Sequence, residues 1–413
     1  MNAEIVAVGS ELLLGQIANT NAQRISEALA AAGVDVFFHT TVGDNPERMA
    51  GVISTALARS DAVVITGGLG PTPDDITREG VAAATGRRLV RDERLVEAIR
   101  GIFDRLGRRA MPESNLRQAD LPEGAAPIEP EGTAPGFVLE HAGTLVFALP
   151  GVPWEMEAML AKTVLPRLAL ASGGGAIVSS EVLVIGAGES HVHEKISDLV
   201  EAQSNPTIAY LAGGGRVKVR VTAKAAGETA ARALIEPVES EVRRRLGHDA
   251  IGPGRATVAD ELGDLLRERR ATVAVAESLT GGLIGAELTH HAGATDFFKG
   301  ALVVYSDDVK VRVAGVDPAV VAAHGAVSEE VAAALARAAA ERLGADLGLS
   351  ATGVAGPGEQ EGKPPGTVFV GASYRGRTEV RSPRAYGDRG NIRVVTATWA
   401  IDLGRRMLLA DGG

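Results

Sequence analysis

The sequence contains no cysteine among its 413 residues. Disulfide bonds, cysteine-ligated zinc sites and iron–sulfur clusters are therefore excluded, and so is every reaction that uses a cysteine nucleophile. Any covalent catalysis in this chain has to use another side chain.

Aromatic residues make up only 3% of the chain, and the 42 basic residues are outnumbered by 52 acidic ones, which gives a net charge of −10. Proteins that bind nucleic acids usually combine a basic surface with aromatic side chains on which bases stack. Direct nucleic-acid binding is therefore not expected.

Long hydrophobic runs are also missing. No stretch of about 18 apolar residues is present, so no membrane span is expected. The N-terminal residues lead directly into a strand pattern, without the basic region and cleavable apolar stretch of a secretory signal. These features predict a cytoplasmic protein that does not associate with membranes.

Short apolar runs that alternate with amphipathic helical patterns predict an α/β protein of several domains. We expect a doubly wound α/β domain over residues 1–168, a small α+β module over 169–250 and a second α/β domain over 256–413. Strands are predicted, in order, at residues 5–8, 34–42, 61–66, 181–185, 216–222, 272–276, 301–305, 346–351 and 366–373. Helices are predicted at residues 19–32, 76–84, 191–202, 228–246, 256–269, 281–290, 328–343 and 391–409. Another helix is expected to begin at Pro46, with Asn45 as its N-cap.

The segment AESLTGG at residues 276–282 lies where a predicted strand ends and a helix begins. Ligands of open α/β sheets bind at the carboxyl ends of strands, and a helix N-terminus can bind a phosphate or an oxyanion. Ser278 would lie at the mouth of such a site, beside Thr280, Gly281 and Gly282. The alternative is that Ser278 or Thr280 only caps the helix.

Two further loops follow predicted strand ends in the C-terminal domain. Tyr305 ends one predicted strand and Lys310 follows it; a lysine with a depressed pKa can activate a serine, and a tyrosine can relay the proton. For Lys310 taken alone, a solvated surface lysine is the more common alternative. The third loop is rich in glycine and contains Gly356 and Gly358, before Thr367 at the start of the next strand.

These segments, together with GAVSEEVA, ATGVAGPG and KPPGTV, closely resemble the C-terminal domain of the CinA family, the nicotinamide-nucleotide amidases. The resemblance covers about 155 residues. It implies hydrolysis of the carboxamide of nicotinamide mononucleotide (NMN) to nicotinate mononucleotide and ammonia, without a cofactor. It also implies that Ser278 is the nucleophile and that Tyr305 and Lys310 activate it. Thr280, Gly281 and Gly282 would hold an oxyanion or the phosphate, and Gly356, Gly358 and Thr367 would line the nucleotide pocket.

The N-terminal domain has its own set of loops at predicted strand ends. The most informative is GGLGPTPDD, in which the amides around Gly67, Gly68, Gly70 and Thr72 could bind phosphate. Asp74 and Asp75 could hold a divalent cation that bridges a diphosphate. Alternatively, Asp75 caps the following helix and Asp74 adds a favourable charge to its first turn. Two other candidate loops contribute Gly9, Glu11 and Asn21.

These loops, with GTAPGF and LPGVP, resemble the molybdopterin-binding-like domain of the CinA family over about 160 residues. In some members this domain hydrolyses ADP-ribose to AMP and ribose 5-phosphate with a divalent metal. The resemblance also implies a homodimer. Three alternatives remain: a nucleotide-sensing N-terminal domain without activity, an accessory role in competence or DNA damage, and molybdopterin chemistry.

Overall fold

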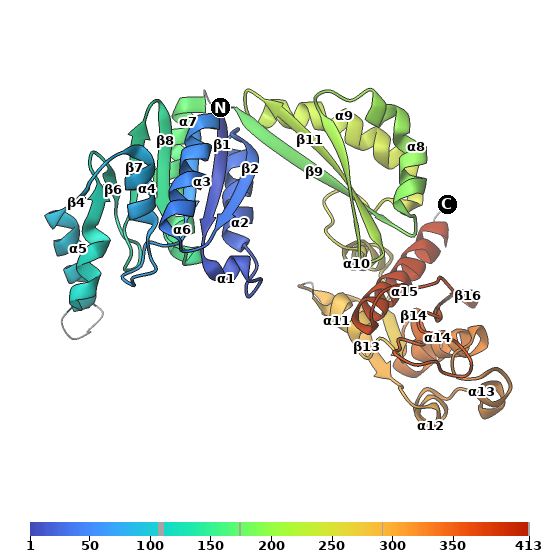
Figure 1. The fold of residues 1–413 in the computed structure, drawn as a ribbon. Coiled ribbons are helices and arrows are strands. Elements are labelled where there is room, and N and C mark those ends of the chain that lie inside the picture. Colours follow the sequence, from blue (N-terminus) through green and yellow to red (C-terminus); the bar gives the residue numbers. More distant parts are fainter. Residues whose placement is uncertain (106–110, 173–174, 291, 412–413) are drawn as a thin grey trace. The chain divides into compact units, whose positions relative to one another are not determined.

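The structure, a computed structural model, describes residues 1–105, 111–172, 175–290 and 292–411 (Figure 1). It divides into two compact units. The first contains Met1–Ser179 and Thr222–Ile235, and the second contains Ser180–Val221 and Glu236–Gly413. Both are mixtures of helices and strands, which confirms the predicted α/β class.

The first unit is built on a six-stranded sheet with the order β2-β1-β3-β8-β7-β6. The strands are β1 (Asn2–Val8), β2 (Asp35–Val42), β3 (Ala62–Thr66), β6 (Ala126–Ile128), β7 (Gly136–His141) and β8 (Thr144–Leu149). Strands β2, β1, β3 and β8 are parallel, as the sequence predicts, whereas β7 and β6 add an antiparallel edge. A separate antiparallel pair is formed by β4 (Leu89–Arg91) and β5 (Asp120–Pro122).

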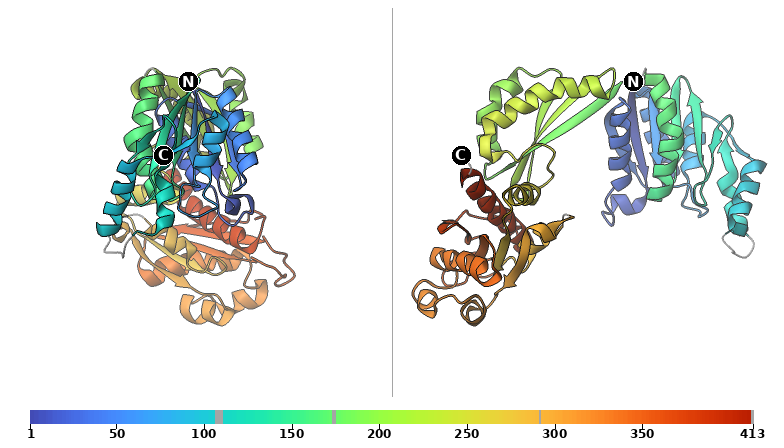
Figure 2. Two further views of the ribbon diagram at one scale, coloured as in Figure 1. Left: turned by 60° about the vertical axis from the view of Figure 1, so that its left-hand side comes forward. Right: turned by 180° about the vertical axis from the view of Figure 1, so that it is seen from behind.

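Helices cover both faces of this sheet, so each face has its own hydrophobic core (Figures 1 and 2). One core includes residues of α3 (Pro46–Arg59), α4 (Thr77–Thr85) and α5 (Glu93–Arg105), and the other includes residues of α2 (Thr20–Ala31), α6 (Pro153–Met159) and α7 (Leu165–Ser172). The remaining helical segments are α1 (Ser10–Leu13), η1 (Glu113–Ala119) and η2 (Leu160–Val164). The side chains of Asn19 and Asn45 cap α2 and α3. The cap at Asn45 was predicted, whereas Asn19 was expected to lie within its helix.

The middle module has a three-stranded sheet with the order β10-β11-β9. Its elements are β9 (Ala176–Ile185), α8 (Glu189–Glu201), β10 (Thr207–Gly213), β11 (Arg216–Ala225), α9 (Glu228–Leu246) and η3 (Gly247–Asp249). The boundary between the two compact units passes through β9, β11 and α9.

The C-terminal domain contains a five-stranded sheet with the order β13-β12-β14-β15-β16. The strands are β12 (Val273–Glu277), β13 (Phe298–Val303), β14 (Leu347–Gly353), β15 (Val368–Tyr374) and β16 (Arg377–Arg381). The first three of the sheet order are parallel, and β15 and β16 are antiparallel additions. The predicted strand 301–305 is wrong at its end, because β13 stops at Val303 and Tyr305 lies beyond it.

Two helical layers enclose this second sheet as well. One core combines α10 (Val258–Arg269), α11 (Leu283–Thr289) and α15 (Arg389–Asp411) with one sheet face, and the other combines α14 (Glu329–Leu343) and η5 (Lys310–Ala314) with the opposite face. Shorter segments are η4 (Ala294–Asp296), α12 (Asp307–Val309) and α13 (Pro318–His324). Within the described ranges, no helix is long and apolar enough to cross a membrane.

Candidate functional site

The three predicted loops of the C-terminal domain meet at one cavity. Because β12, β13 and β14 are parallel neighbours, the segments that follow them lie at the same edge of the sheet. The cavity has a volume of about 330 Å³. The predicted residues that line it are Ser278, Tyr305, Lys310, Gly356 and Gly358.

The turn that carries Ser278 is tightly constrained. Ser278 is 7% exposed, and its amide donates to the carbonyl of Ala351 at 2.9 Å. Gly281 and Gly282 follow with φ angles of 60° and 99°, a backbone region that glycine adopts without steric cost. These two left-handed residues, three and four positions after Ser278, turn the chain into helix α11.

The buried carboxylate of Glu277 explains how this turn is held. One oxygen accepts from the amides of Gly282 at 2.9 Å and Ile284 at 3.1 Å, and the other accepts from Gly285 at 2.9 Å. Glu277 is fully buried at the end of β12. A protein side chain therefore satisfies amide groups at the start of α11 that helices usually leave unpaired.

This arrangement corrects the role predicted for Gly281 and Gly282. The Gly282 amide is bound to Glu277, and the Gly281 amide donates to the carbonyl of Ser278 at 3.1 Å. Neither amide is presented to an oxyanion or a phosphate in this structure. The Thr280 side chain is also fully buried, and its hydroxyl has no hydrogen-bond partner among the residues that the structure describes. Thr280 does not line the cavity.

Different amides in the same turn are available. Within the described part of the chain, no acceptor is bonded to the backbone N–H groups of Leu279 and Thr280. Leu279 lines the cavity and directly follows Ser278. The guanidinium of Arg393 on α15 holds the carbonyls of Leu279 and Thr280, at 3.0 and 2.9 Å, and so fixes the orientation of these peptide groups. The Leu279 amide is thus a better oxyanion donor than either glycine amide.

Lys310 is not a surface lysine. It is 2% exposed, and its ammonium group donates to the carbonyl of Tyr305 at 2.9 Å. Burial lowers the pKa of Lys310 below its ordinary value, and the carboxylate of Asp307, 3.5 Å away, opposes this shift only in part. Burial of an amine favours its neutral form, which can accept a proton.

Tyr305 is 60% exposed, unlike its neighbour Lys310. Its hydroxyl accepts a hydrogen bond from Arg389 at 3.2 Å, and a second nitrogen of Arg389 donates to the carbonyl of Gly356 at 2.6 Å. Arg389 lines the cavity and links two of the three loops. Arg389 could not be found from the sequence, because it lies about 110 positions after Ser278 at the start of a helix.

Thr367 does not line the cavity, contrary to the prediction. Its hydroxyl donates to the carbonyl of Pro364 at 2.9 Å and accepts from Arg384 at 2.7 Å, so it stabilises the turn before β15. Thr352 and Gly353, at the end of β14, are lining residues that the sequence did not indicate. The Thr352 hydroxyl donates to the carbonyl of Ala326 at 2.7 Å.

In the N-terminal domain, the glycine loop is held from inside by a buried arginine. Arg78 is 1% exposed and donates to the carbonyls of Leu69 and Gly70, both at 2.8 Å. Gly67 has a φ of 103°, and a Cβ there would lie 2.3 Å from the carbonyl of Val8. Gly67 is therefore required by a close backbone approach, whether or not the loop binds phosphate.

Asp75 does not cap helix α4, which corrects one of the two alternatives. The helix begins at Thr77 with Ile76 in the cap position. One Asp75 oxygen accepts from both the amide and the hydroxyl of Thr72, at 2.9 and 2.5 Å. These hydrogen bonds close the turn from Thr72 to Asp75. Asp74 is exposed beside it.

The other predicted N-terminal residues hold loops in place. The Asn21 side chain donates to the hydroxyl of Thr66 at 3.1 Å and to the carbonyl of Gly151 at 2.8 Å, so it joins the ends of β3 and β8. A Cβ at Gly9 would lie 2.4 Å from a carboxylate oxygen of Glu11, which places that carboxylate over the glycine.

Comparisons with known proteins agree with these domains. Residues 4–170 match the family model of a probable molybdopterin binding domain, residues 179–252 match the damage-inducible protein CinA KH domain, and residues 255–408 match the CinA C-terminal domain. A CinA-like protein of Dictyoglomus thermophilum is 44% identical over 412 residues, which cover 99% of this chain and 100% of that protein. The chain belongs to the CinA family.

Other CinA family relatives carry different names. A putative competence-damage inducible protein of Bacillus subtilis is 43% identical, with 98% of each chain covered. Among solved structures, the protein CinA with unknown function from Thermoplasma acidophilum is 38% identical, with a TM-score of 0.38; the match covers 41% of this chain and 99% of that one. The resemblance predicted from the motifs is confirmed, and the middle module is a KH domain.

Glu277→Gln tests the constraint on the serine turn. The amide nitrogen of glutamine cannot accept from a backbone N–H, so at least one of the three hydrogen bonds is lost. We expect the free energy of unfolding to fall by about 2 kcal/mol, the usual contribution of a buried hydrogen bond to a charged group. Urea denaturation followed by circular dichroism measures this change.

Glu287→Gln is the matched control, because Glu287 is exposed on the same helix α11. We expect its effect to stay within about 0.5 kcal/mol. Equal stabilities of the two variants would show that Glu277 does not hold the turn.

Proposed function

We propose that the C-terminal domain hydrolyses the carboxamide of NMN to nicotinate mononucleotide and ammonia. The observation that carries this proposal is that Ser278 and the buried Lys310 line one cavity at the carboxyl edge of the sheet. A serine beside a lysine of lowered pKa is a known arrangement for an activated nucleophile. The choice of NMN as the substrate rests on the motifs that this chain shares with the CinA C-terminal domain.

The chemistry proceeds in two steps. Neutral Lys310 takes the proton of Ser278 as its oxygen attacks the carboxamide carbon, and the Leu279 amide stabilises the oxyanion that forms. The C–N bond breaks, the proton passes from Lys310 to the leaving nitrogen, and ammonia departs. Water then attacks the resulting ester with Lys310 again as base, which releases nicotinate mononucleotide and restores the serine.

The remaining lining residues are suited to binding the nucleotide. Arg389 brings a positive charge to the rim, and its bonds to Tyr305 and Gly356 keep it there. A guanidinium binds phosphate oxygens in a fixed geometry. In this account Tyr305 orients Arg389 and the substrate, and Lys310 is the base.

For the N-terminal domain we propose hydrolysis of ADP-ribose to AMP and ribose 5-phosphate. The glycine loop and the adjacent carboxylates of Asp74 and Asp75 support this proposal. Among the residues that the structure describes, no cluster of three or more acidic or histidine side chains could hold a metal. The two aspartates fit a divalent cation only if the substrate diphosphate supplies further oxygen ligands. Such a cation would neutralise charge that develops on the diphosphate.

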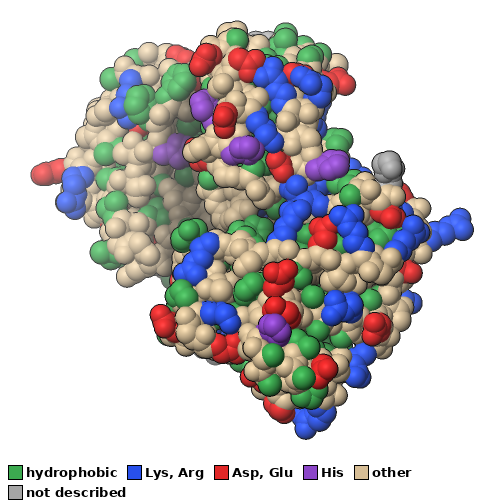
Figure 3. Space-filling view, turned by 90° about the vertical axis from the view of Figure 1, so that its right-hand side faces the viewer, with side chains coloured by type: hydrophobic (Ala, Val, Ile, Leu, Met, Phe, Trp, Pro, Cys, Tyr) green, Lys and Arg blue, Asp and Glu red, His purple; other side chains and the backbone are tan. Residues whose placement is uncertain are grey.

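An accessory role in competence or DNA damage is the second candidate, because relatives carry names of that kind. On the face drawn in Figure 3, Lys and Arg side chains are interspersed with Asp and Glu. Such a mixed surface favours a protein partner over direct contact with DNA.

Lys310→Met tests the amidase proposal. We expect the wild type to release ammonia from NMN in the presence of EDTA, with a kcat/KM that rises with pH. The rise reflects deprotonation of Lys310, so its midpoint should lie below the ordinary lysine pKa of about 10.4. The variant should lose at least about a hundredfold in kcat/KM, because a general base typically contributes this much.

Lys299→Met provides the control, since Lys299 is exposed on β13, the strand that leads to Lys310. Its kinetics should match those of the wild type. If the well-folded wild type releases no ammonia, the proposed amidase activity is refuted. Full activity in Lys310→Met would refute only the role of Lys310 as the general base.

The ADP-ribose proposal has a separate test. AMP formation by the wild type should require Mg²⁺ or Mn²⁺ and stop with EDTA. Asp74→Asn should reduce it at least about tenfold, because one anionic metal ligand is lost. Asp104→Asn, an exposed change on α5, should have no effect. AMP formation that persists in EDTA would contradict the metal-dependent account.

A further inference from the structure

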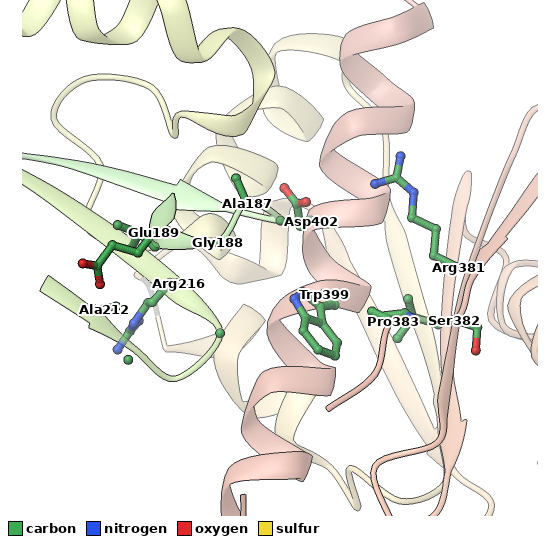
Figure 4. Close-up of a pocket in the computed structure, with 15 residues that line it drawn as sticks. Ala187, Gly188, Glu189, Ala212, Arg216, Arg381, Ser382, Pro383, Trp399 and Asp402 are labelled. Atoms are coloured by element: carbon green, nitrogen blue, oxygen red, sulfur yellow. The ribbon is translucent and has the colours of Figure 1, made fainter. Parts of the chain in front are cut away.

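A second and larger cavity lies elsewhere in the second compact unit. Its volume is about 660 Å³, within the range of roughly 300–1,000 Å³ that is typical of small-molecule sites. Residues of the KH domain and of the CinA C-terminal domain line it, and it shares no lining residue with the Ser278 cavity. We call it the α15 cavity because Trp399 and Asp402 of that helix line it (Figure 4).

The two domains that form the α15 cavity are firmly joined. A guanidinium nitrogen of Arg406 on α15 donates to the carbonyl of Ile185 at 2.8 Å, and the same nitrogen lies 3.0 Å from a carboxylate oxygen of Asp249. Ile185 also belongs to the same hydrophobic core as Leu403 and Met407. The cavity is therefore bounded by packed elements.

Two turns of the KH domain approach α15 closely. A Cβ at Gly215 would lie 2.7 Å from a methyl group of Val395, and a Cβ at Gly186 would lie 3.1 Å from a nitrogen of Arg406. Val395, Trp399 and Asp402 are spaced by four and three residues, so they share one helix face. The turns meet α15 on either side of Trp399, which leaves its indole between them.

Trp399 offers a flat apolar surface to this space. Figure 4 shows the indole between the Ala212–Arg216 hairpin on one side and the segment Arg381–Pro383 on the other. Its ring N–H has no hydrogen-bond partner in the described ranges. Tryptophan is well suited to stacking against a planar ring.

The charged residues around the indole leave two cations without a partner. The exposed guanidinium groups of Arg216 and Arg381 have no ion pair or hydrogen bond within the described residues. Asp402 is 3% exposed and is neutralised by Arg405 and Arg406, which donate to its carboxylate at 2.6 Å. Glu189 is the one remaining acidic lining residue. The lining therefore favours an anion.

We propose that the α15 cavity binds a nucleoside phosphate. The base packs against Trp399, the phosphate oxygens bind the unpaired guanidinium group of Arg216, and the Glu189 carboxylate on the same side of the indole accepts from ribose hydroxyls (Figure 4). Arg381 lies on the opposite side of the indole and adds positive charge to the lining without contacting the phosphate. Guanidinium groups without a protein partner are suited to phosphate because their planar donors match its oxygens. This binding does not depend on the activity at Ser278.

The chain contains two tryptophans, Trp154 and Trp399, so Trp154→Phe leaves Trp399 as the single reporter. Titration of this protein with ADP should quench the Trp399 fluorescence to saturation. Arg216→Gln should raise the Kd about tenfold, since it removes a charged donor to the phosphate, and Arg381→Gln should raise it less. Adenosine should bind at least about tenfold more weakly, and pyrophosphate should not quench.

Arg220→Gln is the matched control, because Arg220 is exposed on the same strand β11 and does not line the cavity. Its Kd should equal that of the parent protein, and Lys310→Met should leave the quenching unchanged. No saturable quenching by ADP, a Kd for Arg216→Gln equal to that of the parent protein, or loss of the signal in Lys310→Met would each overturn the proposal.

Discussion

The hydrogen bonds of the Glu277 carboxylate are the interaction on which the C-terminal site depends. Three amides at the start of α11 converge on one buried side chain. A free helix N-terminus at this place would attract an anionic ligand by itself. Glu277 occupies that position from within the protein. Ser278 and Leu279, in the same turn, line the cavity.

Helix α15 connects this turn to the rest of the second compact unit. Near its start, Arg389 holds the Gly356 loop and Arg393 holds the carbonyls of the serine turn. Farther along, Trp399 lines the second cavity, and Arg405 and Arg406 contact the KH domain. One rigid element therefore passes beside both cavities, and a ligand at either cavity contacts residues of the same helix.

The sequence was sufficient for the α/β architecture because its signals are local. Asn19, Asn45 and Ser328 each cap the helix that follows them, and the apolar runs mark the parallel strands. The sequence also placed the loops of Ser278, Lys310 and Gly356 at strand ends, and in the structure they meet because parallel strands bring their carboxyl ends to one edge.

The features that the sequence could not supply depend on contacts between distant segments. A glutamate at the end of a strand gives no sign that it will accept from three amides, and Arg389 lies far from the loops that it joins. The family resemblance assigned the amides of Gly281 and Gly282 to an oxyanion or the ligand phosphate, whereas here they shape the turn. Lys310 could be interpreted as a surface residue until its burial was known.

The central claim is that Ser278 forms a covalent intermediate with the acyl group of NMN. The most direct test is to quench a reaction of the wild type with NMN in acid within milliseconds and to analyse its peptides by mass spectrometry. The account predicts that the peptide containing Ser278 gains the mass of nicotinate mononucleotide less one water, and that Ser278→Ala shows no adduct and releases no ammonia. Ammonia release at the wild-type rate by Ser278→Ala would contradict the account.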